Sequence, residues 1–406
     1  MTNKAVTSKT DKPSHYERLA EIFRIAKYAA LICMVIYLLL SVAVYRNELT
    51  VENFRYLMKY FDSSSAEYTD GTLKNYNDIY LDATSDIMLG LFNNDLAVVK
   101  GDSINIYNML GNNTFSHTIT YETPMLVTSD KYMLTYALGE YSYIINNSFS
   151  QLYSETFTYP ITGADMSDSG VYLIVTRTLE YKGAVIVYDS SFNPITRILK
   201  DKYIMDAVLS DNGKEVLVVS VYNRSGEFMS EIMAVRPDSG EEEFSITLED
   251  CLAVQCAYND SGFTVLCEDR LLFYDRRGIL LEQVNFGGNL PTKCLLTDTY
   301  QTLVFNENAV GSRSIVTVYS GSGAALYRCG LDGRIVDMES DADAVYILFE
   351  NAAARLDPGR QTTDSVALEN GCLGMVQRDA NVLLICYTNR VHAYAISALF
   401  GEREAG

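Results

Sequence analysis

Residues 210–219 read SDNGKEVLVV, a tight polar turn followed by a short apolar strand, and this pattern decides the fold. Asp, Asn and Gly favour hairpin turns because they bond to the local backbone or tolerate a left-handed conformation. The β-branched residues of Val216–Val219 favour an extended strand. From residue 78 onward the chain shows no helical periodicity, so the turn and the strand are the units to search for as an internal repeat.

The apolar strand recurs eight times, and the first residues of successive copies are 36 to 47 residues apart. The copies are Leu96–Val99, Tyr132–Thr135, Tyr172–Val175, Val216–Val219, Phe263–Leu266, Thr302–Phe305, Val345–Leu348 and Val382–Ile385. A turn that contains Asp precedes most copies, and a strand that ends near Tyr-Asp follows several, as at Val187–Asp189 and Phe273–Asp275. Three landmarks in a fixed order describe one four-stranded antiparallel blade, and radial repetition of such sheets is the β-propeller.

The repeat predicts an all-β, eight-bladed β-propeller of four-stranded antiparallel blades over residues 78–400, with seven blades and one irregular unit as the alternative. The last unit, residues 371–397, has room for only three strands. Residues 78–84 (DIYLDAT) precede the first unit and are expected to supply the missing outer strand, which closes the ring and leaves no open sheet edge. Recurring tyrosines such as Tyr107 and Tyr188 fall at one place in their units, which indicates packing rather than ligand contact.

An uncharged run of eighteen residues, 28–45 (YAALICMVIYLLLSVAVY), precedes the repeat and is near the minimum length for a membrane span. Six Lys or Arg residues lie before it, so the positive-inside rule places residues 1–27 in the cytoplasm and the propeller outside the cell membrane. We expect an uncleaved, single-pass signal anchor, with a cleaved signal peptide as the alternative. Residues 46–77 are predicted to form a short amphipathic helix (48–61) and a polar linker, and residues 401–406 a tail.

The composition and the motifs argue against several classes of function. The formal charge of −20 argues against nucleic-acid binding, because phosphate recognition requires clustered Lys and Arg. Seven cysteines follow Cys33 without a CxxC pair and are predicted to be buried free thiols, with a disulfide framework as the alternative. His117 and His392 are expected to be ordinary strand residues rather than metal ligands. Nucleophile-elbow, phosphate-loop and dinucleotide motifs are missing from the sequence, so we assign no catalytic residue, metal or cofactor and expect no enzyme activity.

The order of features resembles an uncharacterised family of bacterial single-span proteins, common in Clostridia-like Firmicutes, with an extracytoplasmic propeller-like domain. The residues that carry the resemblance are the run 28–45, Thr50–Lys59 just after it, and the repeats Ile106–Asn108 and Val187–Asp189. The family has no known activity, so the resemblance implies a topology and a fold and transfers no functional residue. WD40 propellers fit less closely, because their repeat needs a Trp-Asp dipeptide and this chain contains no Trp.

A membrane-anchored propeller presents loops for recognition, so we expect a binding or scaffolding module in the cell envelope, with an envelope protein or a cell-wall polymer as its partner. The longest excursions between strands, residues 222–230 and 306–314, are the candidate contact loops. Their candidate contact residues are Tyr222, Asn223, Arg224, Glu227, Phe228, Asn306, Glu307 and Arg313. The alternatives are a glycan-acting hydrolase or lyase, which needs a cleft with clustered Asp, Glu and Tyr, and a ligand sensor.

Overall fold

The structure is a computed structural model of the 406-residue chain. It describes residues 15–44, 67–69, 72–74, 76–81, 87–92, 95–108, 110–129, 131–148 and 150–401. The chain divides into two compact units, Met1–Arg55 and Tyr56–Gly406. The first unit contains helix α1 and the second contains the sheets.

Helix α1 (His15–Val44) covers all but the last residue of the uncharged run 28–45. It also takes in residues 15–27, which the sequence assigned to a tail. Within the described part of the chain, no helix reaches both the length and the hydropathy of a bilayer-crossing segment, so the structure does not support the predicted transmembrane span. The predicted amphipathic helix at 48–61 lies outside the described residues.

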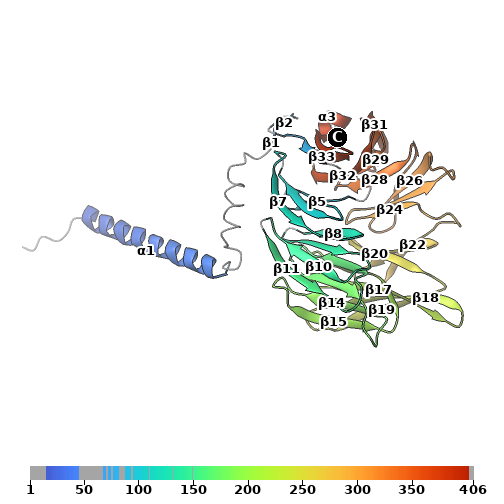
Figure 1. Ribbon diagram of the computed structural model, residues 1–406, viewed down its shortest axis with the longest axis horizontal. Helices are drawn as coiled ribbons and strands as arrows, with labels where there is room; N and C mark the ends of the chain where they lie inside the picture. The colour runs from blue at the N-terminus through green and yellow to red at the C-terminus, as the bar shows by residue number, and fades with distance from the viewer. Residues whose placement is uncertain are drawn as a thin grey trace, which may run out of the picture. The chain divides into compact units, whose positions relative to one another are not determined.

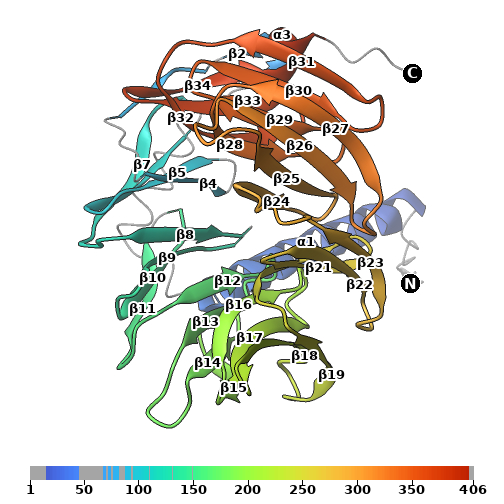
Figure 2. The same cartoon turned by 90° about the vertical axis from the view of Figure 1, so that its right-hand side faces the viewer.

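Eight four-stranded antiparallel sheets follow one another along the second unit, and each is one blade of a β-propeller (Figures 1 and 2). Blades 1 and 2 contain β4 (Met88–Phe92), β5 (Asp95–Val99), β6 (Ser103–Tyr107), β7 (Asn113–Thr118), β8 (Pro124–Thr128), β9 (Met133–Ala137), β10 (Ser142–Asn146) and β11 (Gln151–Thr156). Blades 3 and 4 contain β12 (Gly163–Met166), β13 (Tyr172–Thr176), β14 (Gly183–Tyr188), β15 (Pro194–Lys200), β16 (Tyr203–Leu209), β17 (Val216–Arg224), β18 (Glu227–Val235) and β19 (Glu242–Glu249).

Blades 5 to 7 repeat the same order of pairing. Blades 5 and 6 contain β20 (Ala253–Asn259), β21 (Gly262–Cys267), β22 (Arg270–Asp275), β23 (Leu280–Asn285), β24 (Lys293–Leu296), β25 (Tyr300–Asn306), β26 (Arg313–Ser320) and β27 (Ala325–Asp332). Blade 7 contains β28 (Ile335–Ser340), β29 (Val345–Phe349), β30 (Ala352–Asp357) and β31 (Thr362–Ala367). Together with blade 8, these sheets confirm the predicted eight-bladed architecture, and the seven-bladed alternative is wrong.

Blade 8 combines strands from both ends of the propeller. Its strands are β32 (Cys372–Asp379), β33 (Val382–Tyr387), β34 (Arg390–Ala395) and β3 (Ile79–Tyr80), which pair in the order β3-β34-β33-β32. Ile79 lies opposite Val391 and is fully buried in a cluster shared with β5 of blade 1 and with β33 and β34. The missing outer strand is therefore supplied by Ile79–Tyr80, within the predicted segment 78–84, and the ring is closed by pairing the start of the unit with its end.

The second strand of each blade explains why the repeat is visible in the sequence. All residues of β5, β13, β21 and β33 are buried, because these strands lie between two neighbours in their own sheet and beneath the adjacent blades. A strand that is packed on both faces is a continuous apolar run rather than an alternating one. Outer strands such as β19 alternate between exposed and half-buried residues instead. The eight apolar runs in the sequence coincide with the second strands.

The Asp or Asn after the third strand holds the hairpin turn that leads to the fourth. Asp189 Oδ1 accepts hydrogen bonds from the backbone N–H groups of Ser191 and Asn193, both at 2.9 Å. Asn108 and Asp275 accept the equivalent pair of bonds in blades 1 and 5. The recurring Tyr-Asp landmark is therefore a turn-forming device.

Carboxylates on the first strands join neighbouring blades. The Oδ2 atoms of Asp165, Asp206 and Asp337 accept backbone N–H bonds from Leu209, Cys256 and Met375 at 2.7, 2.9 and 2.9 Å. Each bond runs from the first strand of one blade to the first strand of the next, so these strands form the inner ring. Burial raises the pKa of all three carboxyls above the usual value for Asp, and their accepted N–H bonds oppose that rise.

Three further details refine the sequence predictions. Part of the predicted linker pairs as a two-stranded sheet, β1 (Glu67–Thr69) with β2 (Thr72–Lys74). A short helix, α3 (Ile396–Phe400), follows β34 where only a strand was expected. The cysteines are all free, and those that are buried are Cys251, Cys256, Cys267, Cys372 and Cys386.

Candidate functional site

The antiparallel order of the strands sorts the loops onto two faces of the propeller. The loop face carries the connections between second and third strands and those between blades, whereas the turn face carries the other two hairpin turns of each blade. Among the described connections, six exposed large apolar side chains lie on the loop face and one, Ile279, lies on the turn face. The six are Leu138, Tyr141, Leu179, Tyr181, Leu290 and Val310. The two faces therefore differ in their capacity for apolar contact.

The turn face is acidic near the centre of the ring. Asp168, Asp211, Asp260 and Asp298 come from the first turns of blades 3 to 6. Burial raises the pKa of the Asp298 carboxyl, and the charges of Asp211, Asp260 and Asp168 raise it further. Across the described residues, no group of three or more His, Cys, Asp and Glu side chains has an arrangement that fits a metal ion.

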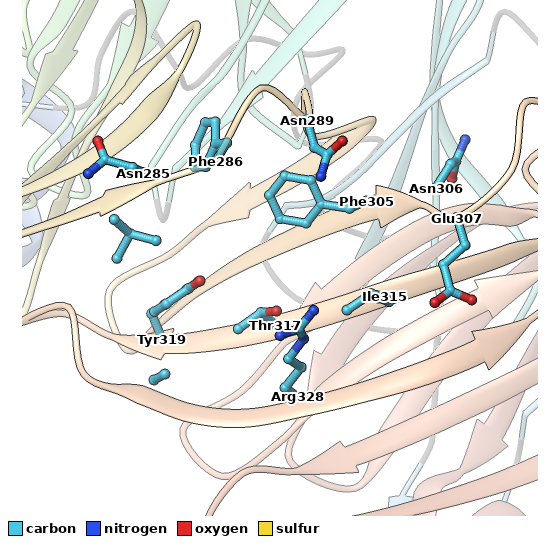
Figure 3. Close-up of a pocket in the computed structure, with 12 residues that line it drawn as sticks. Asn285, Phe286, Asn289, Phe305, Asn306, Glu307, Ile315, Thr317, Tyr319 and Arg328 are labelled. Atoms are coloured by element: carbon cyan, nitrogen blue, oxygen red, sulfur yellow. The ribbon is translucent and has the colours of Figure 1, made fainter.

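A groove of about 630 Å³ lies between blades 5 and 6 (Figure 3). Its walls come from the end of β23, from the connection after β23, and from β25, β26 and β27. The apolar and aromatic lining residues are Val284, Phe286, Phe305, Ile315, Tyr319 and Ala325. The polar lining residues are Asn285, Asn289, Asn306, Glu307, Thr317 and Arg328. Its volume lies within the range of small-ligand and peptide pockets.

Aromatic rings form the fixed part of the groove. Phe286 is buried and meets Phe305 edge to face, with ring centroids 5.6 Å apart and an interplanar angle of 65°. Tyr319 is buried on β26, and burial raises the pKa of its hydroxyl, while Arg328 and Thr317 oppose that rise. The phenol is therefore neutral near pH 7, with the guanidinium of Arg328 in electrostatic contact with it. The rings provide a preformed apolar surface, because their positions are fixed by packing.

The polar residues of the groove differ in whether they already form hydrogen bonds or ion pairs within the protein. Asn306 Oδ1 accepts hydrogen bonds from Thr292 Oγ1 at 3.2 Å and Ser314 Oγ at 3.0 Å. Glu307 Oε2 forms an ion pair with Arg313 Nε at 2.8 Å. Arg328 is exposed and forms no ion pair with any residue that the structure describes. A ligand that enters the groove therefore meets one free cation and no free carboxylate.

One of the two candidate contact loops borders this groove. Within residues 306–314, Asn306 ends β25, Arg313 begins β26, and residues 307–312 connect the two strands on the loop face. Asn306 and Glu307 contribute to the lining. Arg313 lies outside the lining and orients Glu307 through the ion pair.

The other candidate contact loop, residues 222–230, forms the end of a β-hairpin. Residues 222–230 continue β17 and β18, which pair as far as Arg224 opposite Glu227. Ser225 and Gly226 form the two-residue turn with φ angles of 57° and 98°, as the twist of a tight hairpin requires. Of the candidate residues here, Tyr222 is half-buried beneath Lys202, whose Nζ lies 4.4 Å from the ring centroid. The exposed residues on this hairpin are Asn223, Arg224, Glu227 and Phe228.

A second cavity, of about 420 Å³, opens on the turn face between blades 7 and 8. Its charged groups are already bonded within the protein. Asp341 accepts hydrogen bonds from the Ala344 N–H at 2.7 Å and the Tyr346 hydroxyl at 2.9 Å, and Arg355 forms an ion pair with Asp364 at 2.7 Å. The polar groups of this cavity are therefore less available to a ligand than those of the groove.

The two strand histidines make separate contacts. His392 Nδ1 lies beside Asp78 Oδ1, and the His117 ring stacks on Phe115 with centroids 6.4 Å apart.

Sequence reasoning did not find most of the groove. Tyr319 is one of the recurring tyrosines that were interpreted from the sequence as packing residues, and Phe286, Asn289 and Arg328 were not singled out. These residues lie on an outer strand, on a connection between blades and on a third strand, and no shared spacing links them in the sequence. Only the length of the connection after Asn306 gave a usable signal.

Comparison with solved structures shows the fold. The C-terminal WD40 domain of Sif2 superimposes with a TM-score of 0.52 at 12% identity, covering 74% of this chain and 92% of that domain. The β-propeller domain of Cps50 (Swd1) from Myceliophteria thermophila gives a TM-score of 0.49 at 11% identity, covering 79% of this chain and 99% of that domain. At such identities the likeness concerns the propeller architecture alone. A search among curated proteins finds no match.

The family comparison agrees with the resemblance to a family without a known activity, whereas the bacterial origin and the single-span topology stay predictions. The sequence matches the description "Family of unknown function (DUF5711)" over residues 65–390, which takes in nearly all of the propeller. The chain therefore belongs to the DUF5711 family of unknown function.

Proposed function

We propose that this protein is a binding module that holds a partner protein against the loop face of blades 5 and 6. The observation that carries the proposal is the coincidence, at one place, of a preformed aromatic groove with exposed apolar side chains on the loops beside it. Leu290 is 67% exposed and follows Asn289 of the groove, and Val310 is 84% exposed in the connection that contains Glu307.

Such an arrangement suits protein recognition. Burying a large apolar side chain contributes about 1.5–3 kcal/mol, so Leu290 and Val310 add to the binding energy that the groove provides. Strong contacts in interfaces cluster around a pocket and are surrounded by residues that exclude water. The rigid propeller supports this arrangement, since loops on a fixed scaffold lose little conformational freedom when a partner binds.

The glycan-acting enzyme that the sequence left open has less support. Most glycosidases use two carboxyl groups on either side of the scissile bond. The groove lining contains one carboxylate, Glu307, and Arg313 already neutralises it. Among the residues that the structure describes, no particular contact favours the ligand sensor.

We further propose that residues 28–45 attach the protein to the cell membrane and that the propeller faces the envelope, where its partner is an envelope protein. The support is the uncharged run and the basic residues before it. Fractionation of cells, followed by protease treatment of intact spheroplasts, tests this part separately. Recovery of the full chain in the soluble fraction would refute it.

Site-specific photo-crosslinking in the native host tests the binding function. A photoreactive amino acid replaces Leu290 on the loop face or, as a control, Ile279, which is 55% exposed on the turn face. We expect one dominant protein to be crosslinked at position 290 and not at 279, and the additional change Val310→Asp to abolish that product. Equal products at both positions, or a product at 290 that persists with Val310→Asp, would exclude binding through this surface.

A further inference from the structure

The residues that line the groove between blades 5 and 6 indicate the chemistry of its ligand. Its lining combines one cation without a carboxylate partner, Arg328, with the rings of Phe286, Phe305 and Tyr319. Some other exposed arginines already have carboxylates close by, such as Arg236 and Arg334. Arg313, at the edge of the same groove, approaches two carboxylates, Glu307 at 2.8 Å and Asp332 at 3.8 Å.

Arg328 is placed to receive an anion. It lies on β27 beside Thr317 and Tyr319 of β26, and Figure 3 shows its guanidinium group next to Thr317 on the groove wall. The neighbouring hydroxyl of Tyr319 stays neutral, because burial raises its pKa. A guanidinium group without a partner forms short bidentate bonds with a carboxylate, and these bonds are stronger than those between neutral groups.

The rest of the groove suits an extended peptide. The rings of Phe286 and Phe305 form a wall for one aromatic or aliphatic side chain. The side-chain amide of Asn289 makes no hydrogen bond with any described residue, and the residue is exposed at the groove. A volume of about 630 Å³ accommodates a few residues but not a folded domain.

We infer that the groove binds an extended segment of the partner protein in which an aromatic or aliphatic side chain stands next to a carboxylate. This inference rests on the proposed function and names the chemistry that the site selects. The apolar side chain packs against the wall formed by Phe286 and Phe305, and the carboxylate pairs with Arg328. Asn289 supplies a donor and an acceptor for the peptide backbone.

Two short peptides that differ only in charge provide the test. Acetyl-Gly-Phe-Asp-Gly-amide and the same peptide with Asn in place of Asp are titrated against the full chain, and dissociation constants are taken from ligand-observed NMR. We expect the acidic peptide to bind about tenfold more tightly, because a single charge-assisted hydrogen bond can account for a difference of that size. Arg328→Gln should remove that preference and leave the weaker binding of the Asn peptide unchanged.

Arg334→Gln is the matched control, because Arg334 is an exposed arginine outside the groove that lies 3.7 Å from Glu350. It should retain the full preference for the acidic peptide, and circular dichroism should show that both variants are folded. Equal binding of the two peptides by the unaltered protein, a preference that survives Arg328→Gln, or no binding of either peptide at millimolar concentration would overturn the inference. If crosslinking at position 290 still captures one partner in any of those cases, the binding function stands and only the ligand chemistry is wrong.

Discussion

Because β3 closes the ring, shortening one buried side chain near the start of the propeller should lower the free energy of unfolding strongly. Ile79 is 0% exposed and packs against Leu96, Val382 and Val391, which belong to the first and last blades. Replacing a buried Ile with Ala costs about 2–5 kcal/mol, and the cost is smallest where the surroundings relax into the space. A strand of two residues can shift inward, so Ile79→Ala should lower the free energy of unfolding by about 2–3 kcal/mol.

The adjacent residue provides the control. Tyr80 occupies the same strand but is 73% exposed, so Tyr80→Ala should change the free energy of unfolding by no more than about 0.5 kcal/mol. Unfolding of the full chain in guanidinium chloride, followed by far-UV circular dichroism and by tyrosine fluorescence, measures both variants. If Ile79→Ala unfolds within about 0.5 kcal/mol of Tyr80→Ala, β3 does not hold the ring closed and the reasoning fails.

Two further predictions concern the inner ring and a tight strand contact. Burial, together with the charge of Asp337, raises the pKa of Glu339 from 4.5 to about 8, so the folded protein keeps a proton there that the unfolded chain releases. Stability should therefore fall as pH rises from about 4.5 to about 8, and Glu339→Gln should flatten that dependence in urea unfolding series; an unchanged slope would show that Glu339 is ionised when folded. A Cβ atom on Gly262 would lie 2.1 Å from the Tyr274 carbonyl oxygen, so Gly262→Ala should lower the melting temperature strongly. Gly330→Ala, whose nearest neighbour would be 3.7 Å away, should leave it nearly unchanged, and equal melting temperatures for the two variants would contradict the geometry.

The blade count was predictable because each second strand is buried on both faces. Such strands tolerate almost only apolar residues, so Val216–Val219 and its copies stand out against the polar turns around them. The closing strand was predictable because the last unit was one strand short. First and fourth strands could not be delimited in the same way, since they are partly exposed and polar residues interrupt their apolar ones, as in β19.

The candidate site was less predictable, for a geometric reason. A long connection indicates an excursion only when its residues do not pair, and residues 222–230 do pair, so β17 and β18 simply extend further than in other blades. Of residues 306–314, only 307–312 leave the sheet, and Asn306 and Glu307 line the groove. The groove itself arises from the distance between two blades, which sequence spacing within one blade does not encode. No sequence pattern therefore indicated that Arg328 lines a groove.

The distribution of carboxylates explains why an acidic protein has a site for an acidic segment. Asp165, Asp206 and Asp337 join the inner strands, and Asp189 and its counterparts hold turns, so much of the negative charge serves the backbone. At distances beyond about 10 Å, salt screens this charge and its repulsion of an acidic segment is weak. At contact, Arg328 governs the choice between charged and neutral segments. The larger share of affinity then has to come from burying apolar surface at Leu290 and Val310, so substitutions there should weaken binding of any partner, whereas those at Arg328 should change which segment is preferred.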